Sequence, residues 1–287
     1  MSFLERIIER ISYEDEASMR TKTAFVLSGG GNKGIAQIGM LRALQEKGIT
    51  PDVLIGSSVG ALNAAGYSVE PNHEGIDHIQ KIWLEVVPHN IFQGNKLTRA
   101  LNIMKRGGYL FDNAGLKIII EEALKRTGAR NFDDLHLPVR VVTCNYHTGQ
   151  EIVFNNGPIA PALLASAALP GVFPLVDHYG LTLVDGGVVD SVPLWHAFEK
   201  TIKTIYILDT SSSNREVEPK SPLDVILKCF KISRNQRFES ELENSFTHYG
   251  VTVMQFPKIE DRRELEDFGN GEAIIDQAYV KAQDFLS

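Results

Sequence analysis

The sequence predicts an α/β fold in which a central, mostly parallel β-sheet carries helices on both faces. Short apolar runs, several rich in β-branched residues, alternate along the chain with segments of helical period. The first two runs lead through glycine-containing turns into helical segments, as parallel strands do when helices connect them. The 287 residues are 43% hydrophobic and 23% charged, which is ordinary for a globular protein of one large domain or two small ones.

The individual strands and helices follow from local pattern. Apolar runs bounded by turn residues indicate strands, whereas apolar residues spaced three and four apart indicate helices, which Gly48, Gly128 and Pro170 terminate. Strands are expected at residues 23–28, 52–56, 139–146, 150–155, 181–185, 203–209 and 251–256. Helices are expected at residues 35–47, 61–68, 76–87, 114–126, 161–169, 223–244 and 272–285.

The chain divides into three expected parts. Residues 1–20 predict an amphipathic helix with one apolar face, formed by Phe3, Leu4, Ile7, Ile8 and Ile11. Residues 21–210 carry the alternating pattern and the motifs described below. Residues 211–287 begin with a polar loop and are expected as a helical elaboration packed on the same domain. We expect the N-terminal helix to dock on the core, with anchorage at a membrane surface as the alternative.

Composition and charge argue against several classes of function. The net charge of −7 disfavours general nucleic-acid binding, because phosphates require a basic face. Cys144 and Cys229 belong to no pattern with zinc-ligand spacing, so both are expected as buried free thiols in a reducing cytoplasm, with no metal. No stretch is apolar enough to span a bilayer, and charges between Glu5 and Arg10 interrupt any signal peptide. We therefore expect a cytoplasmic protein that contacts membranes only peripherally.

A glycine-rich loop separates the first expected strand from the first expected helix. It consists of Gly29, Gly30, Gly31, Asn32, Lys33 and Gly34. Glycines let backbone N–H groups turn toward a ligand, and a helix N-terminus adds partial positive charge, so the loop predicts an anion site. A dinucleotide-binding fold would place an acidic residue at the end of the second strand, whereas Asp52 precedes that strand.

The second motif is GSSVG, from Gly56 to Gly60, with Ser58 at its centre. A nucleophilic serine at the tip of a sharp strand-to-helix turn requires small residues two positions before and after it. The apolar segments on either side supply the strand and the helix. Ser57 is the alternative nucleophile, but glycines do not flank it at these two positions.

The third motif is Asp185 followed by Gly186 and Gly187, at the end of an expected strand. A carboxylate at this edge of the sheet can accept a hydroxyl proton. An ordinary Asp-Gly turn is the alternative interpretation.

The order and spacing of these three motifs resemble the patatin-like phospholipase family, over about Ala24 to Phe198. The small-residue block ASAALPGVFP, residues 165–174, also resembles the segment that precedes the family's aspartate. The resemblance implies a three-layer patatin-like catalytic domain with a Ser-Asp dyad: Ser58 attacks an ester carbonyl and Asp185 takes its proton. It further implies that the N–H groups of Gly30, Gly31 and Asn32 hold the oxyanion, and that Lys33 is the loop's basic residue.

Three other interpretations remain at this point. A Ser-His-Asp triad would use His196 or His248, because both follow Asp185, whereas His178 reads as a turn residue. A nucleotide-binding α/β protein would use the glycine loop for phosphate and leave GSSVG without a role. A catalytically silent member of the fold would need neither Ser58 nor Asp185, yet both are present.

The sequence thus predicts a serine lipid acyl hydrolase of phospholipase A or lysophospholipase type. Its expected partner is a phospholipid or another acyl ester, with transient contact to a membrane surface. No cofactor, metal or nucleic acid is expected, and the sequence makes no prediction of oligomeric state.

Overall fold

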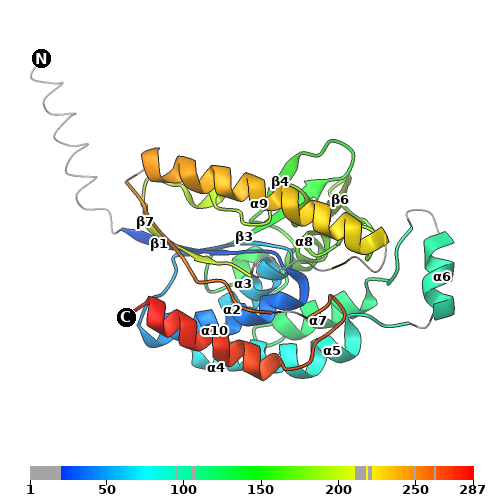
Figure 1. The fold of residues 1–287 in the computed structure, drawn as a ribbon, viewed down its shortest axis with the longest axis horizontal. Helices are drawn as coiled ribbons and strands as arrows, with labels where there is room; N and C mark the ends of the chain where they lie inside the picture. The colour runs from blue at the N-terminus through cyan, green and yellow to red at the C-terminus, as the bar shows by residue number, and fades with distance from the viewer. Residues whose placement is uncertain are drawn as a thin grey trace, which may run out of the picture.

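The computed structural model describes residues 21–94, 96–104, 108–210, 218, 222–248, 250–261 and 263–287. The helix expected for residues 1–20 lies outside the described residues. A β-sheet runs through the middle of the molecule, with one long helix above it and several helices below it (Figure 1). The α/β class with helices on both faces of the sheet is therefore confirmed.

Eight strands form the sheet. They are β1 (Lys22–Leu27), β2 (Val53–Ser57), β3 (Val139–Asn145), β4 (Glu151–Phe154), β5 (Val176–His178), β6 (Leu181–Asp185), β7 (Ile202–Leu208) and β8 (Thr252–Gln255). Their order is β5-β6-β3-β2-β1-β7-β8, and β4 pairs with β3 off this path. Neighbours pair in parallel along the series β3-β2-β1-β7-β8. The strands β4 and β6 each pair antiparallel with β3, and β5 pairs antiparallel with β6.

The helices cover the two faces unequally. The lower layer in Figure 1 contains α2 (Ala36–Glu46), α3 (Val59–Val69), α4 (His73–Lys81), α5 (Val87–Asn90), α7 (Ala114–Leu124) and α10 (Gly271–Phe285). The shorter α8 (Ile159–Ser166) packs on β3, β5 and β6. A single long helix, α9 (Pro222–His248), lies over the opposite face, and α6 (Lys96–Met104) stands at the margin.

Two hydrophobic cores flank the sheet because alternate residues of each strand point to opposite faces. In β1, Phe25 and Leu27 belong to the larger core beneath the sheet. Ala24 and Val26 belong to the smaller core, against which Phe238 of α9 packs. The buried parallel strands explain why their sequences are continuously apolar.

The structure differs from the sequence-based expectation in a few places. The helix expected at residues 76–87 begins earlier, at His73, and continues into α5 through the π-helical turn Ile82–Val86. The three-residue strand β5 and the helix α6 were not predicted. Cys144 is buried as expected, but the expectation for Cys229 is wrong, because this thiol is exposed on α9.

The C-terminal segments join the same sheet and the same helical layer. β8 pairs in parallel with β7, and α10 packs along α2. A Cβ atom added to Gly39 of α2 would lie 2.2 Å from the carbonyl oxygen of Ile275 in α10, so only glycine permits this close approach. None of the helices that the structure describes combines the length and the apolar character needed to cross a bilayer.

Candidate active site

Ser58 lies at a sharp turn between β2, which ends at Ser57, and α3, which begins at Val59. Its φ of 54° is in the left-handed region, which is rare for a residue other than glycine and marks backbone strain. The glycines on either side, Gly56 and Gly60, are required because no side chain would fit at their positions. A Cβ atom at Gly56 would lie 2.5 Å from the carbonyl oxygen of Gly60, and one at Gly60 would lie 2.2 Å from that of Leu27.

The turn is fixed by a side chain that sequence reasoning did not single out. The N–H of Ser58 donates to Ser166 Oγ at 2.9 Å, and this hydroxyl donates to the carbonyl oxygen of Val142 at 2.6 Å. Ser166 is fully buried at the end of α8. It therefore connects the serine turn to β3. Its only signal in the sequence is its place in the small-residue block at residues 165–174.

Asp185 reaches Ser58 because β2 and β6 meet end to end along the same edge of β3. Ser57 pairs with Val142 in the parallel register, and Asp185 pairs with the next residue, Thr143, in the antiparallel register. The two strands run in opposite directions, so their carboxyl ends converge. The hydroxyl of Ser58 donates to Asp185 Oδ2 at 2.6 Å.

The carboxylate of Asp185 is 2% exposed and is held on both oxygens. Besides the bond from Ser58, Asp185 Oδ1 accepts the N–H of Gly187 at 2.7 Å. Burial raises the pKa of Asp185 to about 6, although the hydrogen bonds from Ser58 and Gly187 and the charge of Arg234 oppose this rise. Asp185 is therefore a stronger base than an exposed aspartate, and it remains mostly ionised above neutral pH.

The glycine-rich loop curves around the serine. The N–H of Gly29 donates to the carbonyl oxygen of Ser191 at 2.8 Å, and Thr210 Oγ1 donates to the carbonyl oxygen of Gly29 at 2.9 Å. A Cβ atom at Gly29 would lie 3.1 Å from Ser58 Cβ, so the loop passes directly beside the nucleophile candidate. At Gly34 a Cβ atom would lie 2.5 Å from the Val59 side chain.

Three consecutive N–H groups of this loop are available to a ligand. Within the described part of the chain, the N–H groups of Gly30, Gly31 and Asn32 donate to no acceptor. Gly31 has a φ of 61°, and it begins the 3-10 helix Gly31–Ile35. The Asn32 side chain holds the loop in place, because its amide donates to the carbonyl oxygens of Glu264 and Asp267 at 2.6 and 2.7 Å. This arrangement suits an anion or a developing oxyanion.

A cavity of about 290 Å³ opens in front of these groups. Ser58, Asp185 and the loop form its polar end, together with Lys33, whose pKa is lowered by burial. The rest of the cavity runs among apolar side chains, including Trp83, Phe92, Leu116, Ile119, Phe173 and Phe268. Sites for small molecules commonly combine an apolar interior with a few converging polar groups.

Arg234 enters this cavity from α9, and no sequence motif pointed to it. A Cβ atom added to Gly187 would lie 3.2 Å from Arg234 Nη1, so the guanidinium lies close to the Asp185 turn. Arg234 forms no hydrogen bond or ion pair with any residue that the structure describes. Burial lowers its pKa, while Asp185 opposes this effect.

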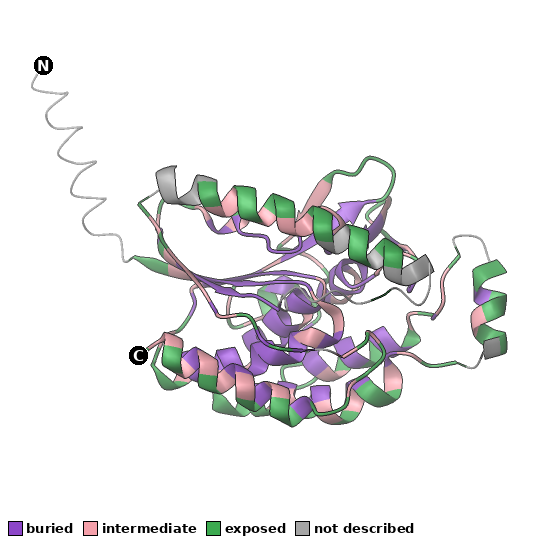
Figure 2. Ribbon diagram, viewed as in Figure 1, coloured by how far each residue is buried: buried purple, intermediate pink, exposed green. Residues whose placement is uncertain are grey.

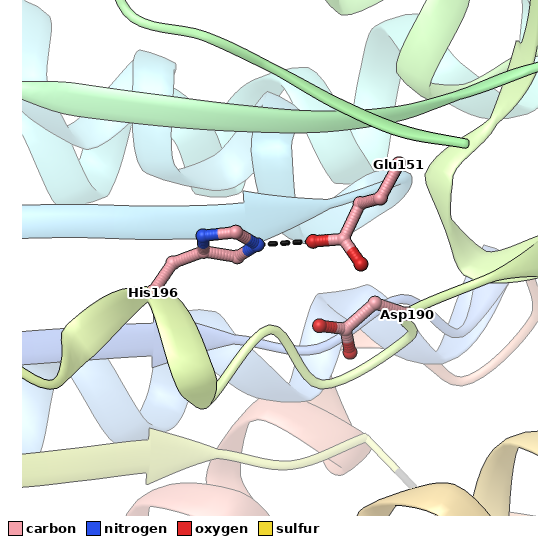
Figure 3. A group of neighbouring side chains, drawn as sticks. All are labelled: Glu151, Asp190 and His196. Carbon is pink, nitrogen blue, oxygen red and sulfur yellow. Dashed lines mark hydrogen bonds and ion pairs between the residues drawn. The ribbon is translucent and has the colours of Figure 1, made fainter.

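Among the residues whose side chains are described, no histidine lines this cavity. His196, the first candidate for a triad, hydrogen bonds through Nε2 to Glu151, as Figure 3 shows. His178 packs against Phe154 and Tyr179 on the β5 side of the sheet. The side chain of His248 lies outside the described residues.

Glu151, Asp190 and His196 form a separate polar cluster with the geometry of metal ligands (Figure 3). Asp190 is 3% exposed, and burial, reinforced by the charge of Glu241, raises its pKa to about 7. Arg237 of α9 already neutralises the cluster, at 3.1 Å from Glu151 Oε2 and 3.5 Å from Asp190 Oδ2. The cluster is therefore best explained as an ion-pair network that attaches α9 to the sheet.

Comparisons with known proteins agree on one family. A family model described as patatin-like phospholipase matches residues 25–198. Patatin-like phospholipase domain-containing protein 7 of Rattus norvegicus is 31% identical over 191 residues, which are 66% of this chain and 14% of the rat protein. An uncharacterized NTE family protein of Mycobacterium bovis is 28% identical over 62% of this chain and 46% of its own length. This chain thus spans less than half of either relative.

The comparison with solved structures supports the fold. The crystal structure of VipD from Legionella pneumophila superposes with a TM-score of 0.50, at 16% sequence identity. The match covers 93% of this chain and 67% of VipD. At this level of identity the likeness concerns the arrangement of strands and helices alone.

Proposed function

The chain belongs to the patatin-like phospholipase family, and we propose that it hydrolyses carboxylic esters of fatty acyl chains, with Ser58 as nucleophile and Asp185 as general base. One observation carries this proposal: the 2.6 Å hydrogen bond from Ser58 Oγ to Asp185 Oδ2 at the polar end of an apolar cavity. Acyl transfer requires a nucleophile that is hydrogen-bonded to its base and lies beside N–H donors that can hold the oxyanion.

The proposed reaction has two steps. Ser58 Oγ attacks the ester carbonyl carbon while its proton passes to Asp185 Oδ2, and the tetrahedral intermediate then expels the alcohol, which takes the proton from Asp185. This leaves an acyl-serine and an ionised Asp185. A water molecule then gives a proton to Asp185 and attacks the acyl carbon, and the proton returns to Ser58 as the fatty acid leaves.

The oxyanion of each tetrahedral intermediate would be held by the N–H groups of Gly30, Gly31 and Asn32. Their lack of acceptors among the described residues supports this assignment, since such donors are held in position by the loop and are not engaged elsewhere. The fixed Asn32 side chain keeps the loop in place during the reaction.

A phospholipid or lysophospholipid is the proposed substrate class. The apolar part of the cavity suits an acyl chain, because burying its methylene groups is favourable by about 0.8 kcal/mol each. Arg234 and Lys33 supply positive charge at the polar end, where the phosphate of a head group would lie.

Labelling with a fluorophosphonate probe tests the proposal directly. We expect one adduct, mapped by mass spectrometry to Ser58, because only an activated serine hydroxyl attacks the phosphorus atom. Ser57→Ala is the matched control: this neighbouring hydroxyl is fully buried and has no hydrogen-bond partner among the described residues, so its loss should leave labelling intact. An adduct on another residue, or none, would count against the proposed enzyme.

Substituting Gly31 by alanine tests the oxyanion role of the loop. We expect ester turnover to fall by about tenfold to hundredfold, because a side chain at φ 61° shifts N–H donors out of position. Gly128→Ala is the control, since Gly128 has a φ of 65° and open space around it. Both variants carry a similar backbone strain of about 1–2 kcal/mol. At Gly31 the new Cβ atom would also lie 2.9 Å from Leu265 Cδ1, the movable end of a side chain, so thermal melts should stay close while turnover differs. Equal turnover in both would make the loop purely structural.

A further inference from the structure

Helix α6 carries its apolar face on the outside of the molecule. Leu97, Leu101 and Met104 follow the helical spacing i, i+4, i+7 and are 69%, 54% and 85% exposed. Ile103, four residues after Arg99 and therefore outside this face, is also 56% exposed. A helix on a globular protein normally turns such an apolar stripe toward the core. In α6 the stripe instead points away from the core. Figure 2 shows the helix at the margin, largely exposed.

The polar side of α6 faces the protein and holds this orientation. Arg99 pairs with Glu266 at 3.1 Å, and its guanidinium lies 4.3 Å from the centre of the Phe111 ring. Asn102 is 3% exposed and donates to the carbonyl oxygen of Leu110 at 3.3 Å. Because these contacts bind the polar face, the apolar face is left exposed.

The contacts of α6 also place it beside the apolar part of the cavity. Phe111, under Arg99, packs against Phe92 with ring centroids 4.8 Å apart, and Phe92 lines the cavity. Glu266, the partner of Arg99, lies between the cavity-lining residues Leu265 and Phe268. The exposed apolar face therefore belongs to a helix attached to the wall of the candidate active site.

The charge of this part of the chain is opposite to that of the whole. The protein has a net charge of −7, yet residues 86–111 contain no aspartate or glutamate and, besides the Arg99 that pairs with Glu266, three basic residues: Lys96, Lys105 and Arg106. Apolar residues together with basic residues are typical of helices that lie in the interface of an anionic membrane. In a symmetric dimer formed through α6, the two identical basic segments would face and repel each other. An acyl chain alone would explain the apolar residues but not the local positive charge.

We propose that α6 docks the protein on an anionic phospholipid surface, with Leu97, Leu101 and Met104 inserted among the lipids. The choice of a lipid surface rests on the proposed function, because an enzyme that takes acyl chains from a membrane needs its cavity close to that membrane. The exposed apolar face and the basic composition of the segment stand independently of it.

Vesicle sedimentation tests this proposal. The wild-type protein is mixed with vesicles of phosphatidylcholine alone, or of equal parts phosphatidylcholine and phosphatidylglycerol. We expect binding to the second kind and little to the first. The double variant Leu97→Asp with Met104→Asp should bind at least about tenfold more weakly, since two apolar side chains are lost from the interface and two negative charges are placed against anionic lipid. Val280→Asp, at a 55% exposed position of α10, should bind as the wild type does.

Five outcomes distinguish the possibilities. Loss of sedimentation in the double variant alone supports the proposal, provided circular dichroism shows it folded. Equal sedimentation of wild type and double variant overturns it, as does equal binding to both kinds of vesicle. Wild-type dimers that the double variant breaks, without vesicle binding, would make α6 a self-association face. Turnover of a short, monomeric ester is measured in parallel: a protein that binds vesicles through α6 but hydrolyses no ester keeps the docking surface and refutes the proposed function.

Discussion

Asp185→Asn is expected to lower ester turnover at least about a hundredfold while the protein stays folded, because an amide cannot take the proton of Ser58. The variant separates chemistry from structure well. Asparagine has the same shape, and its Oδ1 can still accept the N–H of Gly187. The change therefore removes the base and preserves the turn that follows β6.

Asp185→Asn is also expected to change the pH dependence of thermal stability. Burial raises the pKa of Asp185 to about 6, so the folded state disfavours the ionised form. A group whose pKa is raised on folding contributes less stability as pH rises through its folded value, and a rise of this size corresponds to ~3 kcal/mol. We expect Asp185→Asn to melt no lower than the wild type at pH 8, and the difference in its favour to shrink toward pH 4.

Kinetics on a monomeric ester and thermal melts check both expectations. Asp177→Asn is the control, because Asp177 lies on the paired strand β5 but is exposed. It should leave turnover unchanged. Turnover of Asp185→Asn within a few-fold of the wild type would reduce Asp185 to a residue that only caps the Gly187 turn.

Local sequence pointed to the separate parts of this site, whereas the pairing of Ser58 with Asp185 was implied only by the family resemblance. The steric needs of a serine turn are local, so GSSVG identified Ser58, and the glycine loop was equally visible. The approach of Asp185 to Ser58 depends on the register of two strands against β3, across a separation of 127 residues. The short strand β5, which pairs with β6, has only three residues and too little periodicity to be recognised.

Residues that act across the fold were the ones missed. Ser166 and Thr210 hold the serine turn and the glycine loop through contacts far along the chain. Ser166 falls within the small-residue block but was not singled out there, and Thr210 belongs to no motif. Arg234 comes from α9, outside the residues that the family model matches. Helix α6 was missed although Leu97, Leu101 and Met104 have helical spacing, because the helix has only nine residues and carries too short a pattern.

Ester hydrolysis is expected to lose most of its rate at acid pH, which gives the profile of kcat/KM against pH an acid limb. Asp185 accepts a proton only when it is ionised, so kcat/KM should fall about tenfold for each pH unit below its pKa in the free enzyme, which is about 6. Above this value the limb should level off. The raised pKa has a structural cause, since desolvation outweighs the two hydrogen bonds and the positive charge of Arg234.

Arg234→Gln is expected to move this limb to higher pH, because the cation beside Asp185 favours the ionised carboxylate and its loss raises the pKa further. Arg237→Gln is the control, one turn along α9: its charge faces Glu151, Asp190 and Glu241 instead. Asp190, with a pKa of about 7, does not line the cavity, so Asp190→Asn should leave the limb in place.

Initial rates of a soluble ester are measured after brief exposure to each pH, with recovery at pH 8 to exclude unfolding. A limb that stays fixed in Arg234→Gln, or shifts equally in Arg237→Gln, would show that Asp185 is not the group that titrates.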